Sequence, residues 1–314
     1  MSDGHVLVIG AAGIDLKARF GGDGIVWEQS NPGVISNSVG GVARNIGENL
    51  ARLDVKTILL TAVGHDRHGK RVLNQCAAGG MDVSKVRVLR KYRTGTYITL
   101  LKPNGKTWDT VVAVHDYDVL KAVNRAYLLR HIGLFAGAEL IVIDANLSDE
   151  ALATVFELST RFGIRVAADP TTPQLAGRLC DFLPYLYLIT PNASETHALC
   201  GLDFPARERE TAVNAARSLV QLGVRIAVVT VGEHGLAYAD SSVSGFVGAP
   251  QTQVIDPTGG GDALTGALIF GLLNDVGIDE AVRLGATAAA LTVQSKETVL
   301  PELSVELLYD KLIT

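Results

Sequence analysis

The chain has 314 residues and a formal net charge of −5, without a long run of Lys or Arg. This charge pattern argues against a nucleic-acid partner, which normally leaves a basic patch on the protein. Hydrophobic residues make up 47% of the chain and charged residues 19%, which is the composition of a globular protein and excludes a disordered one.

The cysteine content and the length of the apolar runs indicate in which cellular compartment we expect the protein. Cys76, Cys180 and Cys200 are few, odd in number and not in CxxC spacing, so we expect neither a disulfide framework nor a zinc site. The start of the chain lacks the pattern of a signal peptide. The apolar runs are far shorter than the roughly 20 residues that span a bilayer. We therefore expect a cytoplasmic protein without a membrane partner.

Short apolar segments alternate with longer helical segments along most of the chain. The expected strands are rich in Val, Ile and Leu and bounded by Gly, Pro, Asp or Asn. They are Val6–Ile9, Thr57–Ala62, Leu140–Ile143, Arg165–Ala168, Tyr187–Thr190 and Ile226–Thr230. The expected helices are Gly41–Arg52, Gly69–Gly79, Asp149–Phe162, Ala193–Cys200 and Glu208–Leu222. This alternation predicts an α/β domain with a parallel sheet that is covered by helices on both faces.

Residues 16–40 and 86–118 interrupt the alternation. Three segments of the second region have the pattern of antiparallel strands, and Pro103-Asn104-Gly105 predicts a hairpin turn between the last two of them. These segments are Val86–Leu89, Thr96–Leu101 and Thr107–Val114. We interpret both regions as one small β-sheet that projects from a single domain spanning residues 1–314 and acts as a lid. An edge insertion without a function is the alternative.

The strongest chemical signal is the segment Asp256-Pro257-Thr258-Gly259-Gly260-Gly261-Asp262, directly before the apolar helical run Ala263–Leu273. A glycine-rich turn that leads into a helix presents free backbone N–H groups at the positive end of the helix dipole, and such groups bind anions. Asp262 falls in the first turn of this helix. A carboxylate there either caps the helix or accepts a proton from an alcohol that attacks a bound phosphoryl group. The turn is not a Walker P-loop, because GxxxxGK[ST] is absent.

Two segments resemble the signatures of the PfkB/ribokinase family of carbohydrate kinases. The first is Gly40-Gly41-Val42-Ala43-Arg44-Asn45 followed by Glu48-Asn49-Leu50-Ala51-Arg52-Leu53, and the second is 256–270. The resemblance covers nearly the whole chain. It implies a ribokinase-like three-layer α/β/α fold with a mostly parallel central sheet and a small β-sheet lid. It also implies ATP-dependent phosphorylation of a sugar hydroxyl, with Mg²⁺ and K⁺ as the expected cations.

The resemblance also implies roles for individual residues. Asp262 is expected to be the catalytic base, and the amides of Gly259, Gly260 and Gly261 are expected to stabilise the transferring phosphoryl group. The substrate residues are expected to be Asp15 at the end of the first strand, Gly41, Asn45, and the lid residues Thr96 and Asp116. Arg44 is expected to make a surface or lid contact rather than to act in catalysis.

The nucleotide site is expected to contain Asn192, Glu195, Thr230, Gly232, Gly235 and Thr258. Asn192 and Glu195 belong to an NxxE motif, which the resemblance assigns to Mg²⁺, held through water. Their spacing is also that of a helix capping box, and the two roles are compatible. Asp256 is expected to contribute to a monovalent-cation site. Pro257 and Gly260 depart from the usual loop of the family, which puts that cation site in question.

Within the family, three segments are similar to those of pseudouridine kinases. They are Ser30-Asn31-Pro32-Gly33, Asp144-Ala145-Asn146-Leu147 and Val114-His115-Asp116-Tyr117-Asp118. This similarity implies phosphorylation of the 5′-hydroxyl of a ribosyl compound, with pseudouridine as the expected acceptor, and the lid suggests a homodimer. The alternatives are a kinase for another nucleoside or for ribose, and a non-catalytic sugar or nucleoside sensor. A Rossmann dehydrogenase is a weaker alternative, because Gly10-Ala11-Ala12-Gly13 lacks the GxGxxG spacing.

Overall fold

The computed structural model describes residues 4–21, 25–104, 107–201 and 208–312. Its main sheet has eight strands in the order β14-β13-β12-β11-β10-β9-β1-β4. The strands from β12 to β4 pair in parallel, while β13 and β14 pair antiparallel at one edge. The bounds are β1 His5–Ile9, β4 Thr57–Leu60, β9 Ala138–Asp144, β10 Arg165–Asp169, β11 Leu188–Ile189, β12 Ile226–Thr230, β13 Leu236–Ala239 and β14 Ser244–Val247.

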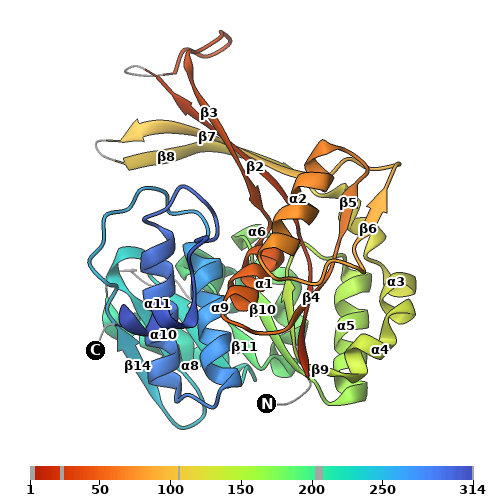
Figure 1. Cartoon of the computed structure of the whole chain (residues 1–314). Coiled ribbons are helices and arrows are strands. Elements are labelled where there is room, and N and C mark those ends of the chain that lie inside the picture. Colours follow the sequence, from red (N-terminus) through yellow and green to blue (C-terminus); the bar gives the residue numbers. More distant parts are fainter. Residues whose placement is uncertain (1–3, 22–24, 105–106, 202–207, 313–314) are drawn as a thin grey trace.

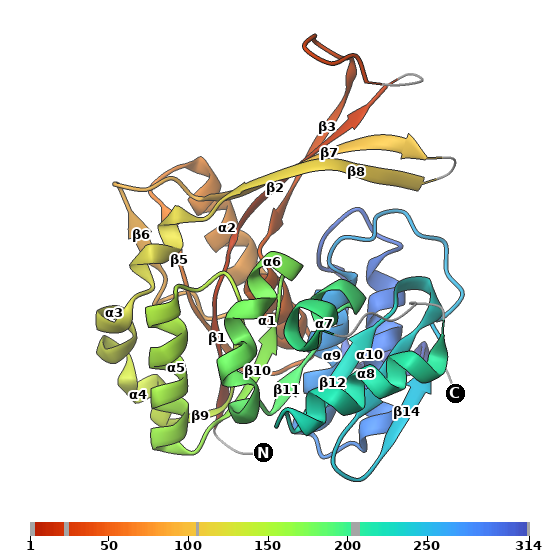
Figure 2. The ribbon, with the colours of Figure 1, turned by 180° about the vertical axis from the view of Figure 1, so that it is seen from behind.

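Helices cover both faces of this sheet (Figures 1 and 2). Alternate residues of each strand point to opposite faces, so Leu7 and Ile9 pack in one buried cluster while Val6 and Val8 pack in the other. The helices over Val6 and Val8 are α1 Val42–Arg52, α2 Arg67–Ala78, α9 Gly260–Leu273, α10 Ile278–Thr292 and α11 Val305–Asp310. Those over Leu7 and Ile9 are α3 Arg125–Arg130, α4 Ile132–Ala136, α5 Asp149–Phe162, α6 Pro173–Ala176, α7 Ala193–Cys200 and α8 Arg209–Gln221. The predicted three-layer α/β/α architecture is confirmed.

Three 3₁₀ helices complete the described helical segments: η1 Asp118–Ala122, η2 Gly177–Tyr185 and η3 Gly232–His234. Across the described ranges, no helix combines the length and the apolar character needed to cross a bilayer.

A second sheet, called the small sheet below, projects from one end of the main domain (Figures 1 and 2). Its strand order is β3-β2-β7-β8. The strands are β2 Gly13–Phe20, β3 Gly33–Gly40, β7 Gly95–Asn104 and β8 Thr107–Asp116. The expected sheet is therefore present and joins both regions that interrupt the alternation. The tip of the hairpin between β7 and β8, including Gly105, lies outside the described residues.

Two details of the expected small sheet are wrong. The segment Val86–Leu89 does not belong to it, because β6 (Arg87–Leu89) pairs in parallel with β5 (Ala62–Gly64) in a separate two-stranded sheet. The small sheet is also not purely antiparallel, since β2 and β7 run parallel. Alternation of apolar residues shows that a segment is half-buried, but it carries no information about which strand lies beside it.

Asp144, the last residue of β9, links the segment after β1 to the first turn of α1. Its carboxylate Oδ2 accepts hydrogen bonds from the N–H groups of Ala11 at 2.8 Å and Ala43 at 3.0 Å, and Oδ1 accepts from Asn146 N–H at 3.0 Å. Ala11 follows β1, and Ala43 lies in the first turn of α1. Burial raises the pKa of Asp144, while these hydrogen bonds lower it. Asp144 thereby fixes the start of α1 against the end of β1.

Arg44 is fully buried, so the expectation of a surface or lid contact is wrong. Its guanidinium forms an ion pair with Glu48, which is also fully buried and is paired a second time with Arg52 at 2.8 Å. Arg44 Nη1 donates to Asn45 Oδ1 at 2.6 Å and to Val39 O at 3.2 Å. A buried guanidinium persists only where opposite charge and hydrogen bonds compensate its desolvation, and these contacts supply both.

Replacing Arg44 with Met should destabilise the protein strongly, because it leaves the Glu48 carboxylate buried with a single partner. Removing one member of a buried ion pair typically costs about 3–5 kcal/mol. The free energy of unfolding from urea denaturation measures the loss. The matched control is Arg125→Met, which breaks an exposed ion pair with Glu157 and should leave the midpoint nearly unchanged. Equal urea midpoints for Arg44→Met and the wild type would contradict the structural role of Arg44.

Candidate active site

The side chain of Asp262 lies at the N-terminus of α9 and contacts the first turns of α1. Asn45 Nδ2 donates a hydrogen bond to Asp262 Oδ2 at 2.7 Å. The Asn45 amide is oriented in turn by Arg44, which donates to its Oδ1 and so leaves the NH₂ group facing the carboxylate. The structure therefore brings together Asp262 and Asn45, two residues that sequence analysis assigned to catalysis and to substrate binding.

The surroundings of Asp262 shift its acidity. Burial raises the pKa of Asp262 to about 7, and the nearby charges of Asp15 and Asp144 add to the rise, whereas the hydrogen bond from Asn45 and the charge of Arg44 lower it. A carboxyl group with a pKa near 7 is a far better proton acceptor than an ordinary aspartate at neutral pH. Asp262 thus has the acidity that a general base at the glycine turn would need.

The glycine turn has the backbone geometry that an anion site requires. Gly259 caps α9 with a φ of 86°, and a Cβ at this position would lie 2.0 Å from Thr298 O, so only glycine fits. A Cβ on Gly261 would meet nothing within 4 Å, which leaves open space before the turn. Among the described residues, the N–H groups of Gly261 and Asp262 donate to no protein acceptor, as is usual for the first turn of a helix. These donors are available to a phosphate.

A pocket of about 620 Å³ lies beside the turn. Its lining includes five residues that sequence analysis assigned to the nucleotide site or to the glycine turn: Thr230, Gly232, Gly235, Gly260 and Gly261. The rest of the lining is mainly apolar and consists of Leu236, Ala249, Pro250, Val254, Pro257, Leu264, Ala286, Ala289, Ala290 and Val293, together with the polar residues Glu233, His234, Gln251 and Thr252. An apolar pocket that ends at free backbone N–H groups suits an aromatic base carrying phosphates.

Asn192 and Glu195 form a complete capping box at the start of α7. Glu195 N–H donates to Asn192 Oδ1 at 3.0 Å, and Asn192 N–H donates to Glu195 Oε2 at 2.9 Å. Burial raises the pKa of Glu195. It also raises the pKa of Asp169 at the end of β10, and the charges of Glu195 and Asp262 raise that pKa further. The charges of Glu195 on α7 and Asp262 on α9 thus act on Asp169, which lies at the carboxyl end of a parallel strand, where α/β sheets bind ligands.

These residues fit a hydrated Mg²⁺. Glu195 Oε1 accepts no hydrogen bond from the described residues, and the charges of Glu195 and Asp262 raise the pKa of Asp169, a repulsion that a nearby cation would relieve. Within the described ranges, no cluster of three or more His, Cys, Asp or Glu side chains has the geometry of direct metal ligands. Mg²⁺ keeps several waters and is often held by one or two carboxylates together with substrate phosphates.

Asp15 was expected at the end of the first strand, but it lies within β2 of the small sheet. Its carboxylate packs against Gly40, where a Cβ would lie 2.2 Å from Oδ2, and Gly41 adopts a φ of 101°. Both glycines are thus required by the protein itself. Burial raises the pKa of Asp15 to about 6. Burial raises the pKa of Tyr117, and the charges of Asp15, Asp144 and Asp262 raise it further.

Thr96 and Asp116 are not brought to this cluster. They pair with each other across β7 and β8, and Asp116 is exposed and accepts a hydrogen bond from Asp118 N–H at 3.0 Å. The residue of β7 that pairs with Asp15 is Tyr97, and cross-strand partners share a face of a sheet. The geometry therefore favours Tyr97 over Thr96 as the neighbour of Asp15.

Asp256 and Thr258 lie where the turn begins. Asp256 Oδ1 accepts a hydrogen bond from Thr258 N–H at 3.0 Å. Its Oδ2 is bonded to Lys17 Nζ at 2.7 Å and to Arg19 Nη2 at 3.0 Å, both from β2. These contacts outweigh its burial and lower the pKa of Asp256. The predicted cation residue thus already has cationic partners from its own chain.

Sequence analysis missed Lys17, Arg19, Tyr117 and Asp169. A signal existed for Asp169, because it follows the expected strand Arg165–Ala168 directly, at the carboxyl end where ligand residues gather. Lys17 and Arg19 were missed because Asp15 was expected at the end of the first strand, so the strand β2 that aligns these three side chains was not anticipated. Tyr117 had no comparable signal, since a single tyrosine after a strand is usually a packing residue.

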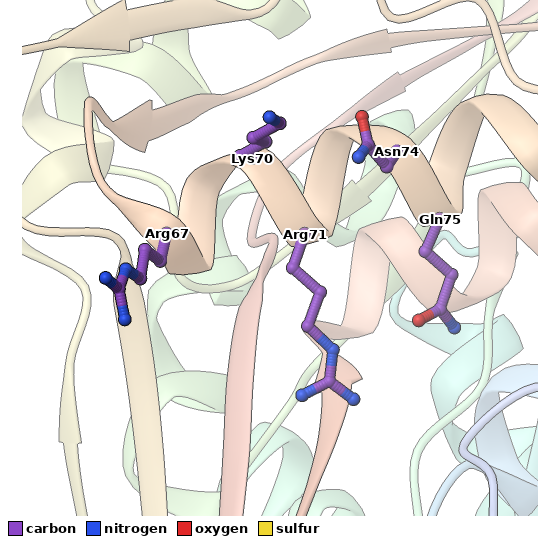
Figure 3. A pocket seen from close by; sticks show the side chains of 5 residues that line it. All are labelled: Arg67, Lys70, Arg71, Asn74 and Gln75. Carbon is purple, nitrogen blue, oxygen red and sulfur yellow. The ribbon is translucent and has the colours of Figure 1, made fainter.

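A second hollow lies on α2, away from the glycine turn. Arg67, Lys70, Arg71, Asn74 and Gln75 line it, and Figure 3 shows these side chains extending outward from the helix. Arg71 donates to Asn37 of β3, which connects α2 to the small sheet. The four residues from Arg67 to Asn74 are exposed, so the hollow has the character of a solvated helix face.

Comparisons with known proteins show which family this chain resembles. The family model "pfkB family carbohydrate kinase" matches residues 3–304. The pseudouridine kinase of Escherichia coli K12 is 32% identical over 302 residues, which cover 96% of this chain and 94% of the relative. The guanosine-inosine kinase of Exiguobacterium acetylicum is 26% identical, with 95% and 97% covered.

A solved structure supports the fold independently. The Arabidopsis thaliana ribokinase complexed with ribose and ATP superposes with a TM-score of 0.80 at 21% identity, covering 100% of both chains. At this identity the likeness concerns the fold alone. Since the family model spans almost the whole sequence, and the glycine turn and its carboxylate are in place, the chain belongs to the pfkB family of carbohydrate kinases.

Proposed function

We propose that this kinase transfers the γ-phosphoryl group of ATP to the 5′-hydroxyl of a ribosyl compound, with pseudouridine as the acceptor. The observation that carries the proposal is the Asp262 carboxylate, with a pKa of about 7, in the same helical turn as the free N–H groups of Gly261 and Asp262. A base and an anion site this close are what phosphoryl transfer to an alcohol requires.

ATP would lie in the pocket of about 620 Å³, with its base against the apolar lining and its phosphates at the glycine turn. The turn's backbone donors would stabilise charge on the transferring group at no cost in reorganisation. Mg²⁺ would be held through water by Asn192 and Glu195, and it would neutralise charge on the phosphates. Thr230 and Asn192 form an isolated parallel β-bridge, so Thr230 lies beside Asn192 and would face the same phosphates.

The acceptor would bind between Asp15, Asn45 and Asp262. Carboxylate and amide groups bind vicinal hydroxyls through several hydrogen bonds, and Asn45 already faces the base. The small sheet, which carries Asp15, would act as a lid over this site within a single domain of residues 1–314. Closing it would exclude water and so limit wasteful ATP hydrolysis.

The choice of pseudouridine rests on the relative that is 32% identical over nearly the full length of both chains. The guanosine-inosine kinase, at 26% identity, supports a second candidate, a kinase for other nucleosides. The proposal includes a cytoplasmic location, where ATP is available. The three cysteines are free thiols, which fits the reducing conditions of that compartment. Fractionation of cells that express the tagged protein tests the location.

The acceptor is tested by a phosphorylation screen of pseudouridine, uridine, inosine, adenosine and ribose with ATP and Mg²⁺. We expect pseudouridine to give the highest kcat/KM, by about tenfold or more over uridine, which corresponds to about 1.4 kcal/mol of transition-state binding. A higher value for inosine or adenosine would favour the second candidate. ATP consumption with none of the five acceptors would contradict the proposed acceptor class.

Replacing Asp262 with Asn should lower kcat by about 10²–10⁴-fold, the usual effect of losing a general base, while ATP affinity stays within a few-fold. In the wild type, kcat/KM should rise with pH up to about 7 and then level off, because the carboxyl group acts only when deprotonated. The variant should lose this ascending limb. Steady-state kinetics across pH, with ATP binding by calorimetry, measure both effects.

The matched control is Asp181→Asn, on η2, which should leave kcat and the pH profile unchanged. A near-normal kcat for Asp262→Asn, or an ascending limb that persists in it, would show that another group accepts the proton.

We also propose a homodimer that forms through the small sheet. Large apolar side chains on this sheet are exposed, with Ile35 at 75%, Val34 at 68% and Val114 at 62% exposure, and β3 and β8 are its edge strands. Such an exposed apolar surface next to unpaired strand edges favours association. Sedimentation velocity should show a dimer for the wild type.

Ile35→Lys should shift the protein towards monomer, while Val88→Lys, on β6 outside the small sheet and 47% exposed, should remain dimeric. A wild-type protein that sediments only as a monomer at micromolar concentration would remove this part of the proposal.

A further inference from the structure

Asp256 is a buried carboxylate at the start of the glycine turn, with an exposure of 5%. Both of its oxygens have partners. Oδ1 accepts from Thr258 N–H, and Oδ2 is bonded to Lys17 Nζ at 2.7 Å and to Arg19 Nη2 at 3.0 Å. A buried carboxylate stays ionised only where opposite charge compensates its desolvation. Here the small sheet supplies that charge.

Lys17 is built into this position rather than resting on the surface. It follows Asp15 by two residues in β2, so both side chains point from the same face of the strand. The Lys17 side chain is 9% exposed and that of Arg19 is 23% exposed. The ammonium group is a compact single positive charge, the nearest equivalent among side chains to a monovalent metal ion.

The residues around Asp256 do not fit an additional monovalent cation, which the resemblance to the family implies at this carboxylate. Oδ2 already carries two cationic donors. The carbonyl oxygen of Val293, which lies against the same segment, accepts from both Ile255 N–H at 2.8 Å and Asp256 N–H at 3.1 Å. An ion such as K⁺ at Asp256 would have to displace Lys17 or lie beside its ammonium, and like charges at short range repel.

We propose that the ammonium group of Lys17 takes the place of the monovalent cation, and that phosphoryl transfer by this protein therefore does not depend on K⁺. Lys17 acts as a positioning residue. Its charge keeps Asp256 ionised, and Asp256 Oδ1 holds the N–H of Thr258, which fixes the approach of the chain to Gly259. The free N–H groups of Gly261 and Asp262 then face the phosphate.

The first test uses the unmodified protein and the acceptor that the screen identifies, so it rests on the proposed function only through that activity. Initial rates are compared in potassium chloride and in tetramethylammonium chloride at equal ionic strength, with ATP and Mg²⁺ saturating. We expect the two rates to agree within about twofold. A rate at least about tenfold higher in potassium would overturn the proposal without any variant.

The second test replaces Lys17 with Met, which keeps the length of the side chain and removes its charge. In tetramethylammonium chloride, kcat should fall by about tenfold or more, and potassium or ammonium ions should restore most of it by filling the vacated place. The matched control is Lys102→Met on β7 of the same sheet, which is exposed and should behave like the wild type in both salts.

A readout without any acceptor separates this inference from the choice of substrate. Thermal denaturation of the nucleotide-free proteins is followed in the two salts. Potassium should raise the Tm of Lys17→Met, because an ion that binds the folded state stabilises it, and should leave the Tm of the wild type unchanged. Loss of activity in Lys17→Met without a response to potassium in rate or Tm would show that Lys17 does not stand in for a cation.

Discussion

The hydrogen bond from Asn45 to Asp262 joins the first turns of α1 and α9, and the site depends on it. The two residues are 217 positions apart, and each turn is fixed independently, since Asp144 holds the start of α1 and the φ of 86° at Gly259 sets the start of α9. Arg44 then orients the Asn45 amide from within the core. Asp262, the Asn45 amide and the free N–H groups of the glycine turn are thereby held on helices, which position groups more precisely than loops do.

A consequence of this arrangement is an accumulation of carboxyl groups at one end of the sheet. Burial raises the pKa values of Asp15, Asp169, Glu195 and Asp262, and the charges of nearby carboxylates raise those of Asp15, Asp169 and Asp262 further. Each raised pKa means that the folded protein disfavours the charged form, so the site reduces stability at neutral pH. Substrate phosphates with their Mg²⁺, and an acceptor hydroxyl on Asp262, would relieve this repulsion. The site is therefore complementary to the loaded complex rather than to the free protein.

Much of this could be predicted from the sequence, because the signals were local. Apolar runs between turn residues identified the parallel strands, and three glycines before a helical run identified the turn that begins α9. The position of Asp15 within β2 and the burial of Arg44 could not be predicted, because both depend on partners distant in the chain. No periodic pattern in the sequence indicates that β2 pairs with β7 or that Arg44 contacts Thr298. For the same reason Tyr97 and Thr96 could not be told apart until the strand register was known.

The ion pair between Lys17 and Asp256, which spans 239 positions, gives the small sheet a second role besides carrying Asp15. Asp15 and Lys17 point from one face of β2, so any displacement of the sheet moves together the carboxylate that we propose to bind the acceptor and the ammonium group that pairs with Asp256. If the sheet swung away, Asp256 would lose its compensating charge while still partly buried, which is unfavourable. The sheet is therefore held towards the turn even before a nucleotide binds. This differs from a site that takes its cation from solution, where the charge at the turn and the position of the sheet vary independently.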